Sequence, residues 1–103
     1  MQGNKKINAM KTKEKANGLF IGVNGLIQQK QFSDAKINLK EMQDCVGGYI
    51  EFVYLPENKI LVVNEEGKLN NLPLNGLATM KFWDNIKDMI VGDVLLIDQK
   101  YID

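Results

Sequence analysis

Apolar residues occur in short runs separated by glycine, asparagine and polar turns, which is typical of a small sheet with a few helices. The first run, 17–23 (NGLFIGV), predicts a strand. It is followed by Asn24-Gly25, a pair favoured in tight hairpin turns because both residues tolerate a positive φ. The polar stretch 28–36 (QQKQFSDAK) predicts an exposed ribbon or a loop.

The next segment carries the signature of a helix start. Asn38 can accept hydrogen bonds from first-turn amides, and Glu41, three residues later, can cap it reciprocally. Gly47-Gly48 provides the left-handed stop, so we expect a helix over 39–46. The apolar residues expected on one face of it are Leu39, Met42 and Val46.

A second hairpin is predicted in the middle of the chain. Residues 49–55 (YIEFVYL) and 60–63 (ILVV) are rich in aromatic and branched side chains, and a polar turn separates them. Another turn ends at Gly67, which we expect to take a positive φ. Residues 68–69 are expected to begin a short third strand.

The last third of the sequence predicts a helix and a covered strand. Asn75 is a candidate cap for a helix beginning at residue 76, and 84–89 either extends it or forms a separate turn. Residues 94–97 (VLLI) form a continuous apolar run typical of a central strand. The residues expected to supply the helix's apolar content are Leu77, Met80 and Phe82 or Trp83. The fold class is therefore α+β, with a small, mostly antiparallel sheet and about two helices in one layered domain.

Charge divides the chain into two parts. Residues 1–16 carry five lysines against Glu14 and predict a basic, disordered arm. Residues 17–103, predicted to be a single domain, carry eight lysines against twelve carboxylates, a balance of −4. The arm is either a solvated tail or a weak, salt-sensitive attachment to nucleic acid or to an acidic partner.

Missing residue types exclude several chemistries. With no histidine, the chain lacks Ser-His-Asp and Cys-His catalysis, and with Cys45 as its only cysteine it lacks a structural zinc site. No arginine is present, which argues against specific DNA readout. No apolar run has the length of a membrane span, so we expect a cytoplasmic protein with no membrane partner. We also expect no cofactor. The same absences argue against an enzyme.

Two polar groups are candidate ligand sites. Asn64, Glu65 and Glu66 lie on a turn whose oxygens suit a hard cation. Calcium usually takes about six to eight oxygens and no EF-hand spacing surrounds these residues, so a polar hairpin turn is the simpler interpretation. Asn75 and Thr79 lie near one helix N-terminus, where free amides attract an anionic or nucleotide-like ligand. Capping alone also explains Asn75.

Aromatic side chains and the cysteine complete the candidates. Most aromatic side chains of a small domain belong to its core. Of Tyr49, Tyr54, Phe82 and Trp83, the two most readily exposed are Tyr54 and Trp83; if exposed, they would stack on a base or contact a protein partner. Cys45 is expected to be a small buried hydrophobe, since no cationic group stands nearby in the sequence.

Four blocks in this order resemble domain-of-unknown-function family 3846: 47–51 (GGYIE), 64–68 (NEEGK), 72–75 (LPLN) followed by Ala78-Thr79, and 90–93 (IVGD). The resemblance covers roughly residues 39–98. It implies a small protein of phages, plasmids or other mobile elements of bacteria. It implies no activity and transfers no catalytic residue.

These observations leave three functional hypotheses. The first is a non-enzymatic accessory protein of a mobile element that binds a host protein and modulates host defence. The second is a domain that sequesters or senses a nucleotide-like small molecule, and the third is a weak nucleic-acid binder acting through the lysine arm, which the absence of arginine disfavours. A homodimer through an uncovered edge strand stays open.

Overall fold

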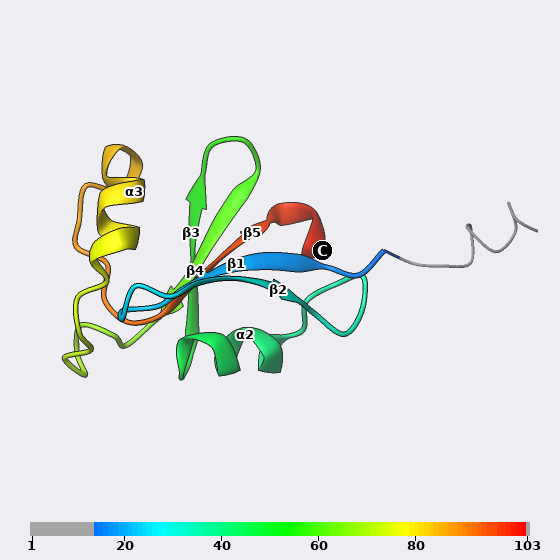
Figure 1. Ribbon diagram of the computed structural model, residues 1–103, viewed down its shortest axis with the longest axis horizontal. Coiled ribbons are helices and arrows are strands. Elements are labelled where there is room, and N and C mark those ends of the chain that lie inside the picture. Colours follow the sequence, from blue (N-terminus) through cyan, green and yellow to red (C-terminus); the bar gives the residue numbers. More distant parts are fainter. Residues whose placement is uncertain (1–13, 103) are drawn as a thin grey trace, which may run out of the picture.

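The computed structural model describes residues 14–102, which form one sheet and two α-helices (Figure 1). The sheet has five strands in the order β2-β1-β5-β4-β3, and every pair is antiparallel. The elements are β1 (Asn17–Ile21), β2 (Ile27–Gln31), α2 (Leu39–Val46), β3 (Ile50–Leu55), β4 (Lys59–Asn64), α3 (Gly76–Ile86), β5 (Val94–Asp98) and the 3₁₀ helix η1 (Gln99–Tyr101). The predicted α+β class is confirmed.

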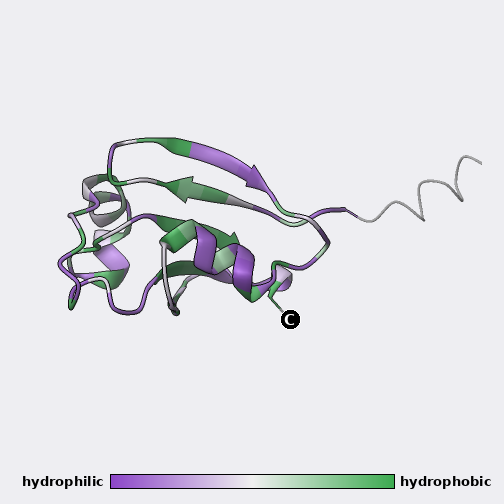
Figure 2. Ribbon diagram, turned by 90° about the horizontal axis from the view of Figure 1, so that it is seen from below, coloured by the Kyte–Doolittle hydropathy of each residue, from purple (hydrophilic) through white to green (hydrophobic). Residues whose placement is uncertain are grey.

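Strands β1 and β2 form the first predicted hairpin. Gly25 adopts φ 89° in the turn, and the Gly22 amide donates to the Leu26 carbonyl at 2.8 Å. The polar stretch 28–36 divides into a ribbon and a loop: residues 28–31 belong to β2, which pairs with β1 along its whole length at one edge of the sheet, and residues 32–36 form a loop. Figure 2 shows β2 as hydrophilic over most of its length, beside the more hydrophobic β1.

Strand β5 lies at the centre of the sheet and joins the two hairpins. It pairs with β1 on one side and with β4 on the other, so that Leu95 stands opposite both Phe20 and Val62. Val94 and Leu95 are fully buried, which confirms the interpretation of 94–97 as a central strand.

Helix α2 begins and ends at the predicted residues. The Asn38 side chain accepts a hydrogen bond from the Glu41 amide at 2.8 Å, and the Glu41 carboxylate accepts one from the Asn38 amide at 3.1 Å. Gly47 adopts φ 77° at the C-cap. Met42 and Val46 are buried, but Leu39 is exposed, so its predicted place on the buried face is wrong.

Each face of the sheet carries its own core, because side chains alternate between faces along each strand. On one face, the apolar residues of β4 and β5 pack with α2; these are Ile60, Val62, Leu95 and Ile97. On the other face, Ile21, Leu61 and Val94 pack with Ala78 and Phe82 of α3. Val53, Leu55 and Leu96 on the α3 face are only partly buried. Within residues 14–102, the α3 face is the more open one, because its core cluster holds six buried residues and that of the α2 face holds ten.

Helix α3 starts after Asn75 as predicted and ends at Ile86. Of the segment 84–89, residues 84–86 extend the helix and residues 87–89 lie outside it. The predicted apolar face was partly wrong. Phe82 is buried, whereas Leu77 and Met80 are 41% and 79% exposed, because the small Ala78 occupies the contact with the sheet.

Three further expectations need correction. The chain after Glu65 runs in turns through Asn71, so there is no strand at residues 68–69. Gly67 does not take a positive φ; a Cβ there would lie 2.9 Å from Val91 Cγ2, so close packing requires the glycine. Ala16, assigned to the arm, is fully buried and exchanges backbone hydrogen bonds with Phe32 and Asp34. Glu14 and Lys15 of the predicted arm are exposed, and its residues 1–13 lie outside the described residues.

Among residues 14–102, no helix combines the length and the apolar composition needed to cross a membrane.

Candidate functional site

The side chains proposed for a ligand at the N-terminus of α3 bind the protein's own backbone instead. Asn75 is fully buried; its carbonyl oxygen accepts from the Ala78 amide at 3.1 Å. Its amide nitrogen donates to the carbonyls of Ile21 and Gly92, each at 2.9 Å. No polar atom of Asn75 faces solvent.

Thr79 is engaged in a similar way. Its hydroxyl oxygen accepts a hydrogen bond from the Ile90 amide at 2.9 Å, and its O–H donates one to the Ile90 carbonyl at 3.3 Å. Asn75 and Thr79 therefore fasten α3 to the segment that leads into β5. The structure gives both a structural role and leaves neither side chain free to receive a nucleotide-like ligand.

The candidate residues Asn64 and Glu65 at the end of β4 have different surroundings. Asn64 donates to the Val46 carbonyl at 3.2 Å and accepts from the Glu66 amide at 2.8 Å, so it ties the turn to the end of α2. Glu65 is exposed. In the described part of the chain, no group of three or more acidic or cysteine side chains is placed to hold a metal ion.

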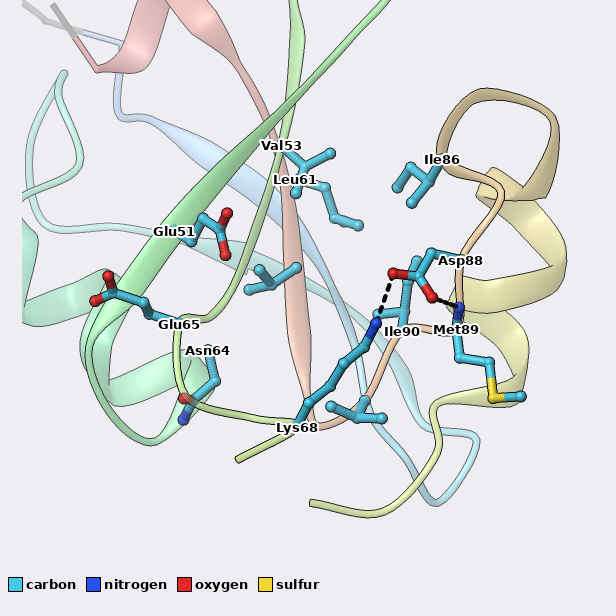
Figure 3. Close-up of a pocket in the computed structure, with 12 residues that line it drawn as sticks. Glu51, Val53, Leu61, Asn64, Glu65, Lys68, Ile86, Asp88, Met89 and Ile90 are labelled. Carbon is cyan, nitrogen blue, oxygen red and sulfur yellow. Dashed lines mark hydrogen bonds and ion pairs between the residues drawn. The ribbon is translucent and has the colours of Figure 1, made fainter. Parts of the chain in front are cut away.

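Glu65 instead borders a groove on the open face of the sheet, between the β3–β4 hairpin and the segment after α3 (Figure 3). We call this the β3–α3 groove. Its volume is about 240 Å³. Its apolar lining comes from β3, β4 and the end of α3 onward: Val53, Leu61, Val63, Ile86, Met89, Ile90 and Val91.

The charged residues of the β3–α3 groove lie on opposite sides of this lining. Figure 3 shows Glu51 and Glu65 on one side and an ion pair between Lys68 and Asp88 on the other. The hydrogen bond from Lys68, together with one from the Met89 amide, holds the pKa of Asp88 below its ordinary value. The ion pair links the turn after β4 to the loop after α3 and closes that side of the groove.

The unbalanced charge of the groove is negative. Lys68 and Asp88 compensate each other, whereas neither Glu51 nor Glu65 forms a side-chain hydrogen bond or an ion pair within residues 14–102. Two free carboxylates beside an apolar floor favour a bound group that has both a cation and an apolar body.

The predicted aromatic residues are exposed but do not share a surface. Tyr54 is 67% exposed and packs edge-on against Phe52, with ring centroids 6.2 Å apart. Tyr54 lies on the α2 face, because Val53 and Leu55 on either side of it belong to the core of the α3 face. Trp83 is 46% exposed on α3. The two rings therefore form no common stacking platform.

Trp83 belongs to an apolar stripe on the solvent side of its helix. Leu77, Met80 and Trp83 recur every three residues, which places them along one side of α3. We call these three residues the α3 outer stripe. Leu74, just before the helix, is also exposed.

Cys45 is buried and free, as predicted. Burial raises the pKa of its thiol above the ordinary value, which disfavours the reactive thiolate. It is not a candidate nucleophile.

Sequence reasoning missed Glu51, Lys68 and Asp88. The signal for Glu51 was present, because it is the one charge in the apolar strand segment YIEFVYL and therefore marks a side chain on an uncovered face. The signal for the ion pair was absent, because its partners are 20 residues apart and meet only through the fold.

Comparison with protein families gives one match. The family model named Domain of unknown function (DUF3846) matches residues 19–101, which include all of β2 through η1 and most of β1. No curated protein and no solved structure matches the chain.

Proposed function

The chain belongs to the DUF3846 family, and from this premise we propose that it is a non-enzymatic accessory protein of a bacterial mobile element that binds a host protein. Modulation of host defence is the proposed consequence of that binding, in the cytoplasm of the host. No catalytic step is part of the proposal.

The α3 outer stripe carries this proposal. Single exposed apolar side chains are common on protein surfaces. Leu77, Met80 and Trp83, however, are neighbours along one side of the same helix, and Met80 is 79% exposed. Tryptophan and methionine are enriched in the centres of protein interfaces, where they bury a large area and adapt to the partner's shape. An apolar patch on the partner is the matching chemistry.

The hydrogen bonds around α3 favour a protein partner over a nucleotide-like ligand. The two polar side chains at the start of α3 are used within the fold, and the outer stripe is the exposed apolar feature of this helix. A rigid helix held at its start by Asn75 presents that stripe with little ordering cost on binding.

The proposal is tested by affinity capture with paired variants. Met80→Glu places a charge in the outer stripe, and Leu69→Glu makes the same change at a side chain 77% exposed in the turn after β4. Each tagged protein is incubated with lysate of a bacterial host, and retained proteins are quantified by mass spectrometry. We expect at least one host protein to be retained by the unchanged chain and by Leu69→Glu and lost with Met80→Glu.

Retention of the same proteins by all three chains contradicts the proposal, as does retention of none. The defence component has its own readout. Phage plating and plasmid transfer are compared between hosts that express the unchanged chain or Met80→Glu, with and without the host's defence genes. An effect that does not depend on those genes contradicts that component.

A further inference from the structure

The outer edge of β3 is open within the part of the chain that the structure describes. Strand β3 is the last strand of the sheet, and all six of its residues pair with β4 on its inner side. Within residues 14–102 no strand covers its other side. Such an edge offers backbone donors and acceptors to an added strand, which is a recurring mode of peptide recognition.

The open edge and the β3–α3 groove are adjacent. Glu51 and Val53 project from alternate positions of β3 on the α3 face, and both line the groove. A segment that pairs with β3 would therefore place every second side chain beside Glu51 and Val53 (Figure 3). The groove, at about 240 Å³, has room for a branched apolar side chain.

We propose that the β3 edge and the β3–α3 groove together bind an extended, basic segment of a protein partner. The segment adds a strand to β3, inserts an apolar side chain above Val53 and Leu61, and brings lysine or arginine side chains to Glu51 and Glu65. This assignment rests on the proposed protein-binding function and names the chemistry of the partner segment.

Charge complementarity selects this occupant over a second copy of the chain. A second copy paired through β3 would bring no cation to Glu51 or Glu65, because β3 carries Glu51 and no lysine. Lys68 does not supply the missing charge, because Asp88 already pairs with it. A basic segment meets both free carboxylates.

The test uses the full chain and a fluorescently labelled, end-blocked hexapeptide of alternating lysine and valine. Its dissociation constant is measured by fluorescence anisotropy at low salt. Two double variants are compared. The groove variant carries Glu51→Lys and Glu65→Lys. The control variant carries Glu57→Lys and Glu66→Lys, which change the net charge equally at two exposed carboxylates outside the groove. Circular dichroism verifies that both variants fold.

We expect the groove variant to weaken binding by about tenfold or more and the control variant by less than about threefold, since the contacts in the groove are short-range and the others are screened. The groove variant should also prefer a glutamate–valine hexapeptide. Two N-methylated lysine–valine peptides are also measured, one methylated at every lysine amide and the other at every valine amide. Only one of the two should lose binding, because only one set of alternate amides faces β3.

Several outcomes overturn the proposal. Equal losses in the two variants would mean unspecific attraction between opposite charges, and insensitivity to N-methylation would exclude strand addition. Binding seen only after deletion of residues 1–13 would make the chain's own basic segment the occupant. A concentration-dependent dimer dissolved by Glu51→Lys would make a second copy the occupant.

Affinity capture separates this inference from the proposed function. If a host protein lost with Met80→Glu is still retained by the Glu51→Lys, Glu65→Lys variant, the proposed function stands and the groove inference fails. Loss of that protein with both variants supports both.

Discussion

Asn75→Ala should be far more destabilising than loss of a helix cap alone. The substitution removes the cap of α3, which is worth about 1 kcal/mol. It also deprives the buried carbonyls of Ile21 and Gly92 of their Asn75 donor, at about 1–1.5 kcal/mol each. We expect a decrease of about 3–4 kcal/mol in the free energy of unfolding, a large share of the roughly 5–15 kcal/mol typical of a small domain.

Asn38→Ala is the matched control, because Asn38 caps α2 through the same kind of bond but is exposed. Water replaces its partners, so we expect a loss of about 1 kcal/mol. Urea unfolding of both variants is followed by circular dichroism and by the fluorescence of Trp83, the only tryptophan, which lies on α3. Losses that agree within about 0.5 kcal/mol would refute the reasoning, because the buried hydrogen bonds would then add nothing beyond capping.

Three further predictions concern packing, the thiol and pH. Gly67→Ala should cost about 1–3 kcal/mol because its Cβ meets Val91, whereas Gly76→Ala, with open space around its Cβ, should be neutral or stabilising; thermal melts compare the two. Cys45 in the native protein should react with iodoacetamide at least about tenfold more slowly than in urea. Because burial raises the pKa of the Cys45 thiol, the stability that this thiol contributes is lost as the pH rises above the pKa of the thiol in the unfolded chain. Burial alone would raise the pKa of Glu41, but the hydrogen bonds that its carboxylate accepts outweigh burial and lower this pKa. The stability that Glu41 contributes is therefore lost as the pH falls through its folded pKa. Urea titrations of Glu41→Gln should show a weaker dependence of stability on acid pH. An unchanged acid slope with Glu41→Gln, or equal alkylation rates, would contradict these arguments.

Local signals were enough to place the helices and hairpins. The reciprocal bonds of Asn38 and Glu41 and the left-handed Gly47 involve residues close in sequence, so their residue types indicate them directly. The order of strands was not predictable in this way, because the position of β5 between β1 and β4 depends on contacts between distant segments.

The errors on α3 have a similar cause. The helix has two apolar sides, Ala78 with Phe82 and Leu77 with Met80, and the sequence does not say which one meets the sheet. Hydropathy favours the larger side chains, whereas the close approach of the helix to the sheet requires the small Ala78.

The candidate site was predictable only in part. Asn75 was recognised as a cap, but its acceptor at Ile21 lies 54 residues away, so the burial that removes it from a ligand is a property of the tertiary structure. The sequence singles out Glu65 as an oxygen ligand for a cation, whereas in the structure Glu65 borders the β3–α3 groove.

The central position of β5 has a consequence for synthesis. Residues 94–98 are made after both hairpins, yet they hold the two hairpins together. On the ribosome, which adds about 5–20 residues per second, the hairpins wait with their inner edges unpaired until this strand has left the exit tunnel. A stalled or prematurely released chain that lacks β5 therefore exposes two aggregation-prone edges at once, and should be a preferred client of chaperones and proteases.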